Sequence, residues 1–157
     1  MSKVPPLTGI AEIVLNVADL PAMKDFYITV LGFPLHSEVC LETEDADPDG
    51  EPTISFLTIK PLETPLGPLH PQLLVLIDYR RHVYARQRMA GHDVTQSTLN
   101  HLAFEIPPES WPDHLARLQQ LGLDPVETEF PAMMARAIFF RDPEGNVLEL
   151  ISRKTDH

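Results

Sequence analysis

The sequence has almost no cysteine and no long uninterrupted apolar segment. Cys40 is the single cysteine among 157 residues, so the chain cannot close an internal disulfide. No apolar run reaches the roughly 18 residues that a membrane-spanning helix needs, and residues 1–6 lack the apolar stretch of a signal peptide. These absences favour a cytoplasmic protein that does not insert into a membrane.

Positive charge is also scarce. The chain carries 12 lysines and arginines against 23 aspartates and glutamates, which gives a formal net charge of −11. A protein of this charge repels nucleic acid on average. The basic cluster of Arg80, Arg81, Arg86 and Arg88 has a spacing typical of a solvated helix face. Nucleic acid is therefore not an expected partner.

The first half of the chain begins with a strand and a helix. Residues 10–17 alternate so that one face is apolar while the other carries Glu12 and Asn16. Asp19 is placed to cap the start of a helix, and Gly32 is placed to end it. Further strands are predicted at about 34–42, 53–60 and 72–79.

An acidic segment separates the first two of these later strands. Its residues match the opening of a calcium-binding loop at Asp45, Asp47, Asp49 and Gly50. The bidentate glutamate of that loop belongs at position 56, where the sequence has Phe56. The segment is therefore interpreted as an acidic hairpin loop.

The second half repeats the same order of elements. Residues 100–106 alternate as a strand, with His101, Ala103 and Glu105 on its more polar face. A helix follows, for which the sequence predicts a buried apolar stripe of Trp111, Leu115, Leu118 and Leu121. The remaining strands are predicted at 125–130, 135–140 and 147–152, the last two joined by a turn at 142–146.

The two halves align as an internal repeat. Glu12 corresponds to His101 at an offset of 89 residues, and residues 74–77 correspond to 148–151 at an offset of 74. In each half the predicted order of elements is one strand, one helix and three further strands. A long period with only two copies indicates a duplicated domain. We predict one domain at 7–152, made of modules 7–80 and 98–152 joined by a linker at 81–97.

Several segments resemble the vicinal oxygen chelate superfamily, which includes glyoxalases, bleomycin resistance proteins and extradiol dioxygenases. Residues 17–20 and 26–33 resemble its opening, and residues 100–104 resemble the start of its second module. Residues 140–150, Phe-Arg-Asp-Pro-Glu-Gly-Asn-Val-Leu-Glu-Leu, resemble its closing signature, the most specific part. The resemblance implies an α+β fold in which two tandem βαβββ modules form a curved mixed sheet around a central cavity.

The resemblance also implies a metal site. Ligands come from the first and last strands of each module, which here places Glu12, Val75, His101 and Glu149 at the four positions. Val75 has no donor atom, so Glu12, His101 and Glu149 remain. The sequence supports the trio, because Glu149 lies in an otherwise apolar strand where a lone carboxylate is costly. One histidine and two carboxylates favour Mn²⁺, Fe²⁺, Ni²⁺ or Mg²⁺ over a structural Zn²⁺ site.

The reaction is less clearly indicated than the site. Glyoxalase-type isomerases use four protein ligands, and extradiol dioxygenases and fosfomycin-resistance transferases have a catalytic tyrosine where this sequence has Phe139. Glu105 is a candidate general base, with a rim position in a salt bridge as the alternative. The expected function is a metal-dependent lyase or dioxygenase-like enzyme that chelates a small oxygenated substrate.

A binding protein without turnover is the alternative. Proteins of the bleomycin-resistance type use the same fold to sequester a drug or antibiotic, and an acidic chain suits a cationic ligand. In either case the exposed edges of the predicted sheets favour a homodimer.

Overall fold

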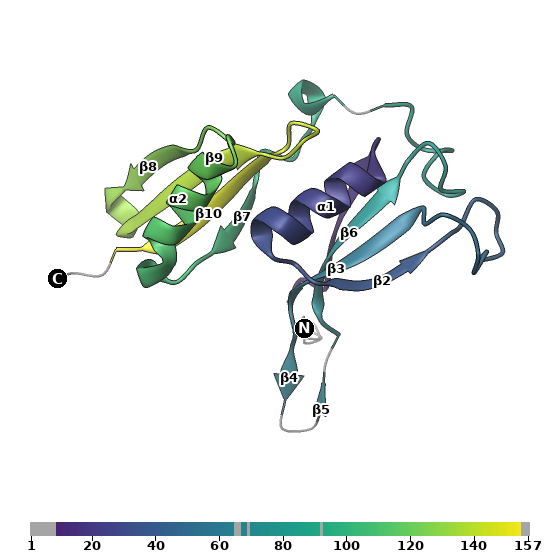
Figure 1. Cartoon of the computed structure of the whole chain (residues 1–157), viewed down its shortest axis with the longest axis horizontal. Helices are drawn as coiled ribbons and strands as arrows, with labels where there is room; N and C mark the ends of the chain where they lie inside the picture. The colour runs from purple at the N-terminus through teal and green to yellow at the C-terminus, as the bar shows by residue number, and fades with distance from the viewer. Residues whose placement is uncertain (1–8, 65–66, 69, 92, 155–157) are drawn as a thin grey trace, which may run out of the picture. The chain divides into compact units, whose positions relative to one another are not determined.

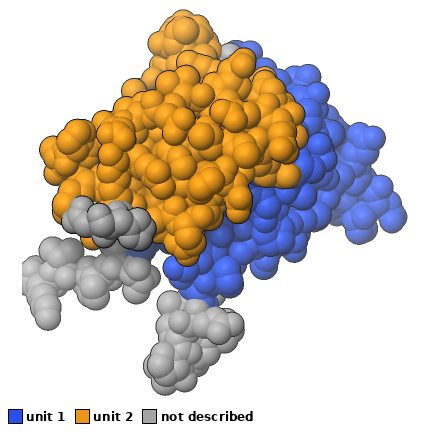
Figure 2. All heavy atoms as spheres, turned by 60° about the vertical axis from the view of Figure 1, so that its left-hand side comes forward, with its two compact units in different colours: residues 1–92 blue, residues 93–157 orange. Residues whose placement is uncertain are grey.

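The computed structural model describes residues 9–64, 67–68, 70–91 and 93–154. The chain forms two compact units, residues 1–92 and 93–157 (Figure 2). Each unit contains a four-stranded mixed sheet and one α-helix (Figure 1). The predicted α+β fold of two βαβββ modules is confirmed. None of the described helices has the length and apolar character needed to cross a membrane.

Unit 1 follows the predicted order of elements, with one short hairpin added. Its elements are β1 (Glu12–Val17), α1 (Leu20–Leu31), β2 (Leu35–Val39), β3 (Ile54–Lys60), β4 (Glu63–Thr64), β5 (Gly67–Pro68) and β6 (Gln72–Asp78). The main sheet has the order β1-β6-β3-β2, with β1 parallel to β6 and the other neighbours antiparallel. The sequence did not predict the β4–β5 hairpin.

Helix α1 begins and ends where the sequence predicts. The Asp19 carboxylate accepts a hydrogen bond from the backbone N–H of Ala22 at 3.0 Å, which satisfies a free donor of the first turn. Gly32 ends the helix with φ of 72°, a left-handed conformation that glycine adopts without steric cost. The helix packs against β3 and β6. The residues buried in this unit include Val17, Met23, Tyr27, Leu57, Leu74 and Leu76.

Unit 2 repeats this arrangement. Its elements are η1 (Val94–Gln96), β7 (Leu102–Glu105), η2 (Pro108–Ser110), α2 (Trp111–Gln120), β8 (Val126–Phe130), η3 (Pro131–Met133), β9 (Ala135–Arg141) and β10 (Val147–Arg153). The sheet order is β7-β10-β9-β8, with β7 parallel to β10. This order matches unit 1, strand for strand, as a duplicated module requires.

Helix α2 covers one face of its sheet. Trp111 and Leu118 are buried, and the Arg136 guanidinium of β9 lies 4.1 Å from the centre of the Trp111 ring. The prediction that Leu121 belongs to the buried stripe is wrong, because its side chain is 47% exposed. The helix ends at Gln120, and Leu121 is the C-terminal cap that follows the last helical residue.

The acidic segment joins β2 and β3 as a loop. Asp47 forms an isolated antiparallel bridge with Cys40, and the Asp47 N–H donates to the Cys40 carbonyl at 3.1 Å. Cys40 is 5% exposed. A Cβ atom at Gly50 would lie 2.6 Å from the Cys40 Sγ, so this turn needs glycine. The segment is therefore the hairpin loop that the sequence predicts.

Candidate metal centre

In unit 2, the register of the sheet places the predicted ligands on the face opposite α2. Glu149 of β10 lies beside Ala103 of β7 in the parallel register and opposite Phe139 of β9 in the antiparallel register. Leu148 and Leu150 on either side of Glu149 point the other way, toward the buried core. The Glu149 carboxylate is therefore directed to the face that no helix of this unit covers.

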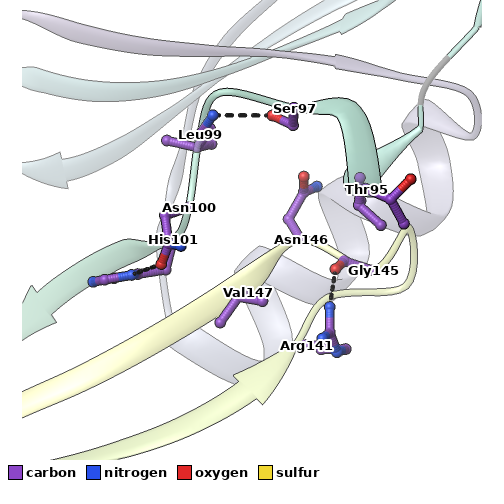
Figure 3. A pocket seen from close by; sticks show the side chains of 10 residues that line it. Thr95, Ser97, Leu99, Asn100, His101, Arg141, Gly145, Asn146 and Val147 are labelled. Carbon is purple, nitrogen blue, oxygen red and sulfur yellow. Dashed lines mark hydrogen bonds between the residues drawn. The ribbon is translucent and has the colours of Figure 1, made fainter.

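His101 and Glu149 are in direct contact. The His101 Nε2 lies 2.9 Å from the Glu149 Oε2, and the Glu149 side chain is only 5% exposed. The other ring nitrogen, Nδ1, lies 2.7 Å from the Asn100 side-chain oxygen (Figure 3). Since an amide oxygen can only accept, Nδ1 donates this bond. The free lone pair of the neutral ring is then on Nε2 and points at the carboxylate.

Either a proton or a metal ion can lie between these two groups. A lone pair on Nε2 and a carboxylate oxygen repel each other unless a proton or a metal ion lies between them. Two ligand atoms each about 2.1 Å from an octahedral cation lie about 3.0 Å apart. The observed 2.9 Å separation fits adjacent metal ligands, and it equally fits a hydrogen bond from a protonated imidazole to the carboxylate. The bond from His101 to Asn100 is the kind of support that metal-bound imidazoles have.

Phe139 lies beside this pair. The rings of Phe139 and His101 are 5.8 Å apart and nearly perpendicular, at 88°. The family resemblance implies a tyrosine at this position in some subclasses, and this chain has Phe139 there. Its ring gives the site an apolar wall and has no proton to donate. A mechanism that depends on a tyrosine at this position is excluded.

In unit 1, Val75 occupies the place that corresponds to Glu149. Val75 lies beside Val14 in the parallel register of β1 and β6, and Val14 is the counterpart of Ala103 in the repeat. Val75 is buried and has no donor atom. The alignment of the two modules in the sequence thus agrees with the strand register of the structure.

Glu12 lies at the start of β1, on the same face as Val14. Its carboxylate is 38% exposed, and Oε1 lies 3.6 Å from the Nε2 of His70. Sequence reasoning missed His70, because it precedes β6 in a segment rich in proline where no strand pattern marks which way a side chain points. The closeness of the parallel strands β1 and β6 is the signal that would have found it.

The structure thus brings the candidate ligands together in pairs. Within the described residues of either unit, no group of three histidines, cysteines, aspartates or glutamates gathers as a metal site. Unit 2 contains His101 with Glu149, and unit 1 contains Glu12 with His70. The joining of Glu12 to the pair of unit 2 stays a prediction.

Glu105 is the predicted general base. It is the last residue of β7, exposed to solvent, and lies beside Ile151 of β10. Because side chains alternate along a strand, Glu105 shares its face with Ala103 and His101. It can therefore reach a molecule bound on the face that carries Glu149.

Each unit also contains a hollow. In unit 2 a hollow of about 230 Å³ borders His101 and is lined by Val94, Thr95, Ser97, Leu99, Asn100, Arg141, Gly145, Asn146 and Val147 (Figure 3). The Arg141 Nη1 donates to the carbonyl of Gly145 at 2.7 Å, and both residues line the hollow. This hollow offers space and polar groups next to the metal-ligand pair.

In unit 1 a hollow of about 310 Å³ lies near the end of β1. It is lined by Asn16, Ile77, His82, Tyr84, Ala85, Arg88 and Met89. Burial lowers the pKa of His82 below its usual range, because an apolar environment disfavours the charged ring. The His82 Nδ1 accepts the backbone N–H of Tyr84 at 3.3 Å, which suits a neutral ring.

Comparison with known proteins agrees with this architecture. The chain matches the family described as Glyoxalase/Bleomycin resistance protein/Dioxygenase superfamily over residues 9–150. Lactoylglutathione lyase from Agrobacterium tumefaciens is similar in structure, with a TM-score of 0.60 and 18% identity over 96% of this chain and 97% of the other. No curated protein sequence matches the chain.

Two further structures show the same likeness. A variant of the fosfomycin resistance protein FosX from Listeria monocytogenes, complexed with Mn(II) and 1S,2S-dihydroxypropylphosphonic acid, has a TM-score of 0.63 and 18% identity over 94% of each chain. A glyoxalase/dioxygenase from Nostoc punctiforme has a TM-score of 0.58 and 21% identity over 98% of this chain and 97% of the other. At such identities the structures establish the fold. The family match covers nearly the whole chain, and the chain belongs to the glyoxalase, bleomycin resistance protein and dioxygenase superfamily.

Proposed function

We propose that the chain is a metal-dependent enzyme that acts on a small oxygenated molecule, with Glu12, His101 and Glu149 as metal ligands. The observation that carries the proposal is the contact of His101 with the buried Glu149 carboxylate, supported by the bond from His101 to Asn100. The FosX structure with Mn(II) is a precedent for a divalent metal on this fold.

The donor set favours particular cations. One imidazole and two carboxylates suit Mn²⁺, Fe²⁺, Ni²⁺ or Mg²⁺, and Zn²⁺ with open positions is also compatible. A bound divalent ion would act as a Lewis acid that polarises two neighbouring oxygens of the substrate. Phe139 contributes an apolar ring beside His101.

Glu105 completes the proposed site as a general base. It is on the same strand face as His101 but does not touch the metal-ligand pair, which leaves it available to a bound substrate. The hollow beside His101 gives the substrate space, with Arg141 and Ser97 on its wall. The reaction class that fits these groups is lyase or dioxygenase-like chemistry without a tyrosine.

Calorimetric titration with Mn²⁺, Ni²⁺, Fe²⁺ and Zn²⁺ tests the proposal. We expect one ion per chain in the wild type, no measurable binding in His101→Ala, and strongly weakened binding in Glu149→Gln, because an amide is a poorer donor to a hard cation. The matched control is Glu105→Gln, which makes the same change on the same face and keeps metal affinity. Metal should also raise the melting temperature of the wild type, since it binds the folded state.

The alternative is a protein that binds a drug or antibiotic without turnover. The apolar residues Phe139 and Val75, at positions where relatives place a hydroxyl or a ligand, favour this alternative over a tyrosine-dependent enzyme. If no metal binds the wild type better than His101→Ala, the enzyme proposal fails and the binding protein becomes the better interpretation.

A further inference from the structure

A second imidazole and carboxylate meet in unit 1, outside the trio that the repeat indicates. The His70 Nε2 lies 3.6 Å from the Glu12 Oε1. His70 is 55% exposed and Glu12 is 38% exposed at their side chains. An exposed pair of this kind contributes little to stability. The two groups are therefore accessible from solvent and are not held in place by the core.

The hydrogen bond at the other ring nitrogen sets the tautomer of His70. Its Nδ1 lies 2.7 Å from the backbone carbonyl oxygen of Pro71. A carbonyl oxygen only accepts, so Nδ1 donates and the lone pair of the neutral ring is on Nε2, facing Glu12. This is the arrangement in which a histidine binds a metal through Nε2 while a neighbouring oxygen orients the ring.

The two units share this pattern. In unit 2, Nδ1 of His101 donates to Asn100 and Nε2 faces Glu149 at 2.9 Å. In unit 1, Nδ1 of His70 donates to Pro71 and Nε2 faces Glu12 at 3.6 Å. Two donor atoms about 2.1–2.2 Å from one cation lie about 3.0–3.1 Å apart at a right angle and about 3.4–3.6 Å apart at a tetrahedral angle. Both separations fit a pair of ligands on one ion.

We propose that His70 is a metal ligand of this chain, paired with Glu12, and that it compensates for the missing donor at Val75. The inference rests on the proposed function, since it assumes that Glu12 binds the metal. Val75 cannot ligate, so unit 1 would otherwise supply a single oxygen. With His70, unit 1 supplies one nitrogen and one oxygen.

A second nitrogen changes which metals the site prefers. An imidazole added to carboxylate ligands favours Ni²⁺, Fe²⁺ or Zn²⁺ over Mg²⁺. The inference therefore commits the site to a transition metal. Removal of His70 should cost more affinity for Ni²⁺ than for Mn²⁺, because Ni²⁺ gains more from nitrogen donors.

Calorimetry of the full chain with Ni²⁺ and Mn²⁺ tests the inference. Wild type is compared with His70→Ala, with His101→Ala, and with the control His36→Ala, which removes another exposed histidine of the same unit on β2. We expect His70→Ala to lower Ni²⁺ affinity at least about tenfold, the size that even supporting partners of a ligand contribute. The loss for Mn²⁺ should be smaller, and His36→Ala should bind like the wild type.

The outcomes separate this inference from the proposed function. If His70→Ala binds Ni²⁺ like the wild type while His101→Ala has lost it, His70 is an ion-pair partner of Glu12 only and the inference is overturned. If His101→Ala also binds like the wild type, the proposed metal site is overturned as well. A thermal melt of metal-free His70→Ala that matches the wild type shows that any lost affinity does not come from unfolding.

Discussion

At the residue scale, the histidines of this chain differ through what their ring nitrogens contact. The His101 and His70 rings each donate from Nδ1 to an oxygen of a neighbouring residue, and in each ring Nε2 faces a carboxylate. His82 uses Nδ1 as an acceptor for a backbone N–H instead. The first two rings suit metal binding, whereas His82 is a buried ring whose charged form the fold disfavours.

His82 should make the folded state sensitive to acid. Its pKa is lowered by burial below the value of 6.5 for an unfolded chain. As pH falls below about 6.5, the unfolded chain binds a proton that the folded chain does not, so the free energy of unfolding decreases until the lowered pKa is reached. His114 acts in the same direction, since burial also lowers its pKa.

The variant His82→Gln isolates this contribution. The amide oxygen of glutamine can still accept the Tyr84 N–H, but it does not titrate. We expect the free energy of unfolding, measured with urea at pH 7.5 and 5.5, to fall less in His82→Gln than in the wild type. His36→Gln, at an exposed position, is the control. Equal pH dependence in His82→Gln and wild type would contradict the prediction.

At the element scale, a partly buried charge network ties α1 to its sheet. The Lys24 Nζ of α1 donates to the Glu38 Oε1 of β2 at 2.8 Å, and the Ser55 hydroxyl of β3 donates to the same oxygen at 2.6 Å. Burial raises the pKa of Glu38, but the bonds from Lys24 and Ser55 together outweigh it, so the pKa lies below its usual value of 4.5. The carboxylate thus stabilises the fold in its charged form.

Lys24→Met should therefore destabilise the protein in a pH-dependent way. A lowered carboxylate pKa contributes stability that is present above about pH 4.5 and is lost as the pH falls through the folded value. We expect Lys24→Met to lower the free energy of unfolding by about 1–2 kcal/mol at pH 7, and by less at pH 3. Lys60→Met, on an exposed lysine, should change little at either pH. A cost that is the same at pH 3 and pH 7 would indicate lost packing instead.

The sequence predicts the elements well where periodicity and capping act together. Asp19 and Gly32 mark both ends of α1, and the offset between Glu12 and His101 predicts the register that the strands adopt. Prediction fails where tertiary neighbours decide. The exposure of Leu121 depends on where α2 stops, and the contact of His70 with Glu12 depends on the path of the segment before β6, in which no strand pattern marks the direction of a side chain.

At the scale of the whole molecule, each sheet has edge strands whose backbone groups face no partner within that sheet. In unit 1 the strand at one edge is β1, which pairs with β6 alone, and in unit 2 it is β7, which pairs with β10 alone. Edges of this kind tend to pair with another strand. Glu12 lies on the edge strand β1, and His101 directly precedes the edge strand β7.

The expected assembly is a homodimer. With two modules per chain, a complete site could form within one chain or from module 1 of one chain and module 2 of another. In either case, a symmetric pair of chains could supply hydrogen-bond partners to the edge strands. We expect sedimentation equilibrium at micromolar concentration to give about twice the chain mass of 17.7 kDa. Where a monomer is found at that concentration, the dimer prediction is wrong.

A mixing experiment identifies which chain supplies Glu12 to a site. The variants Glu12→Gln and His101→Ala are each expected to lose metal affinity. If modules are exchanged between chains, a mixed dimer contains one site with both intact residues, and an equimolar mixture that has exchanged subunits should recover roughly a quarter of the wild-type sites. If each chain completes its own site, every site carries one defect and mixing recovers nothing. The control is the double variant Glu12→Gln/His101→Ala mixed with wild type. If modules are exchanged between chains, this mixture contains fewer intact metal sites than its wild-type chains would form alone. If each chain completes its own site, all the wild-type sites stay intact.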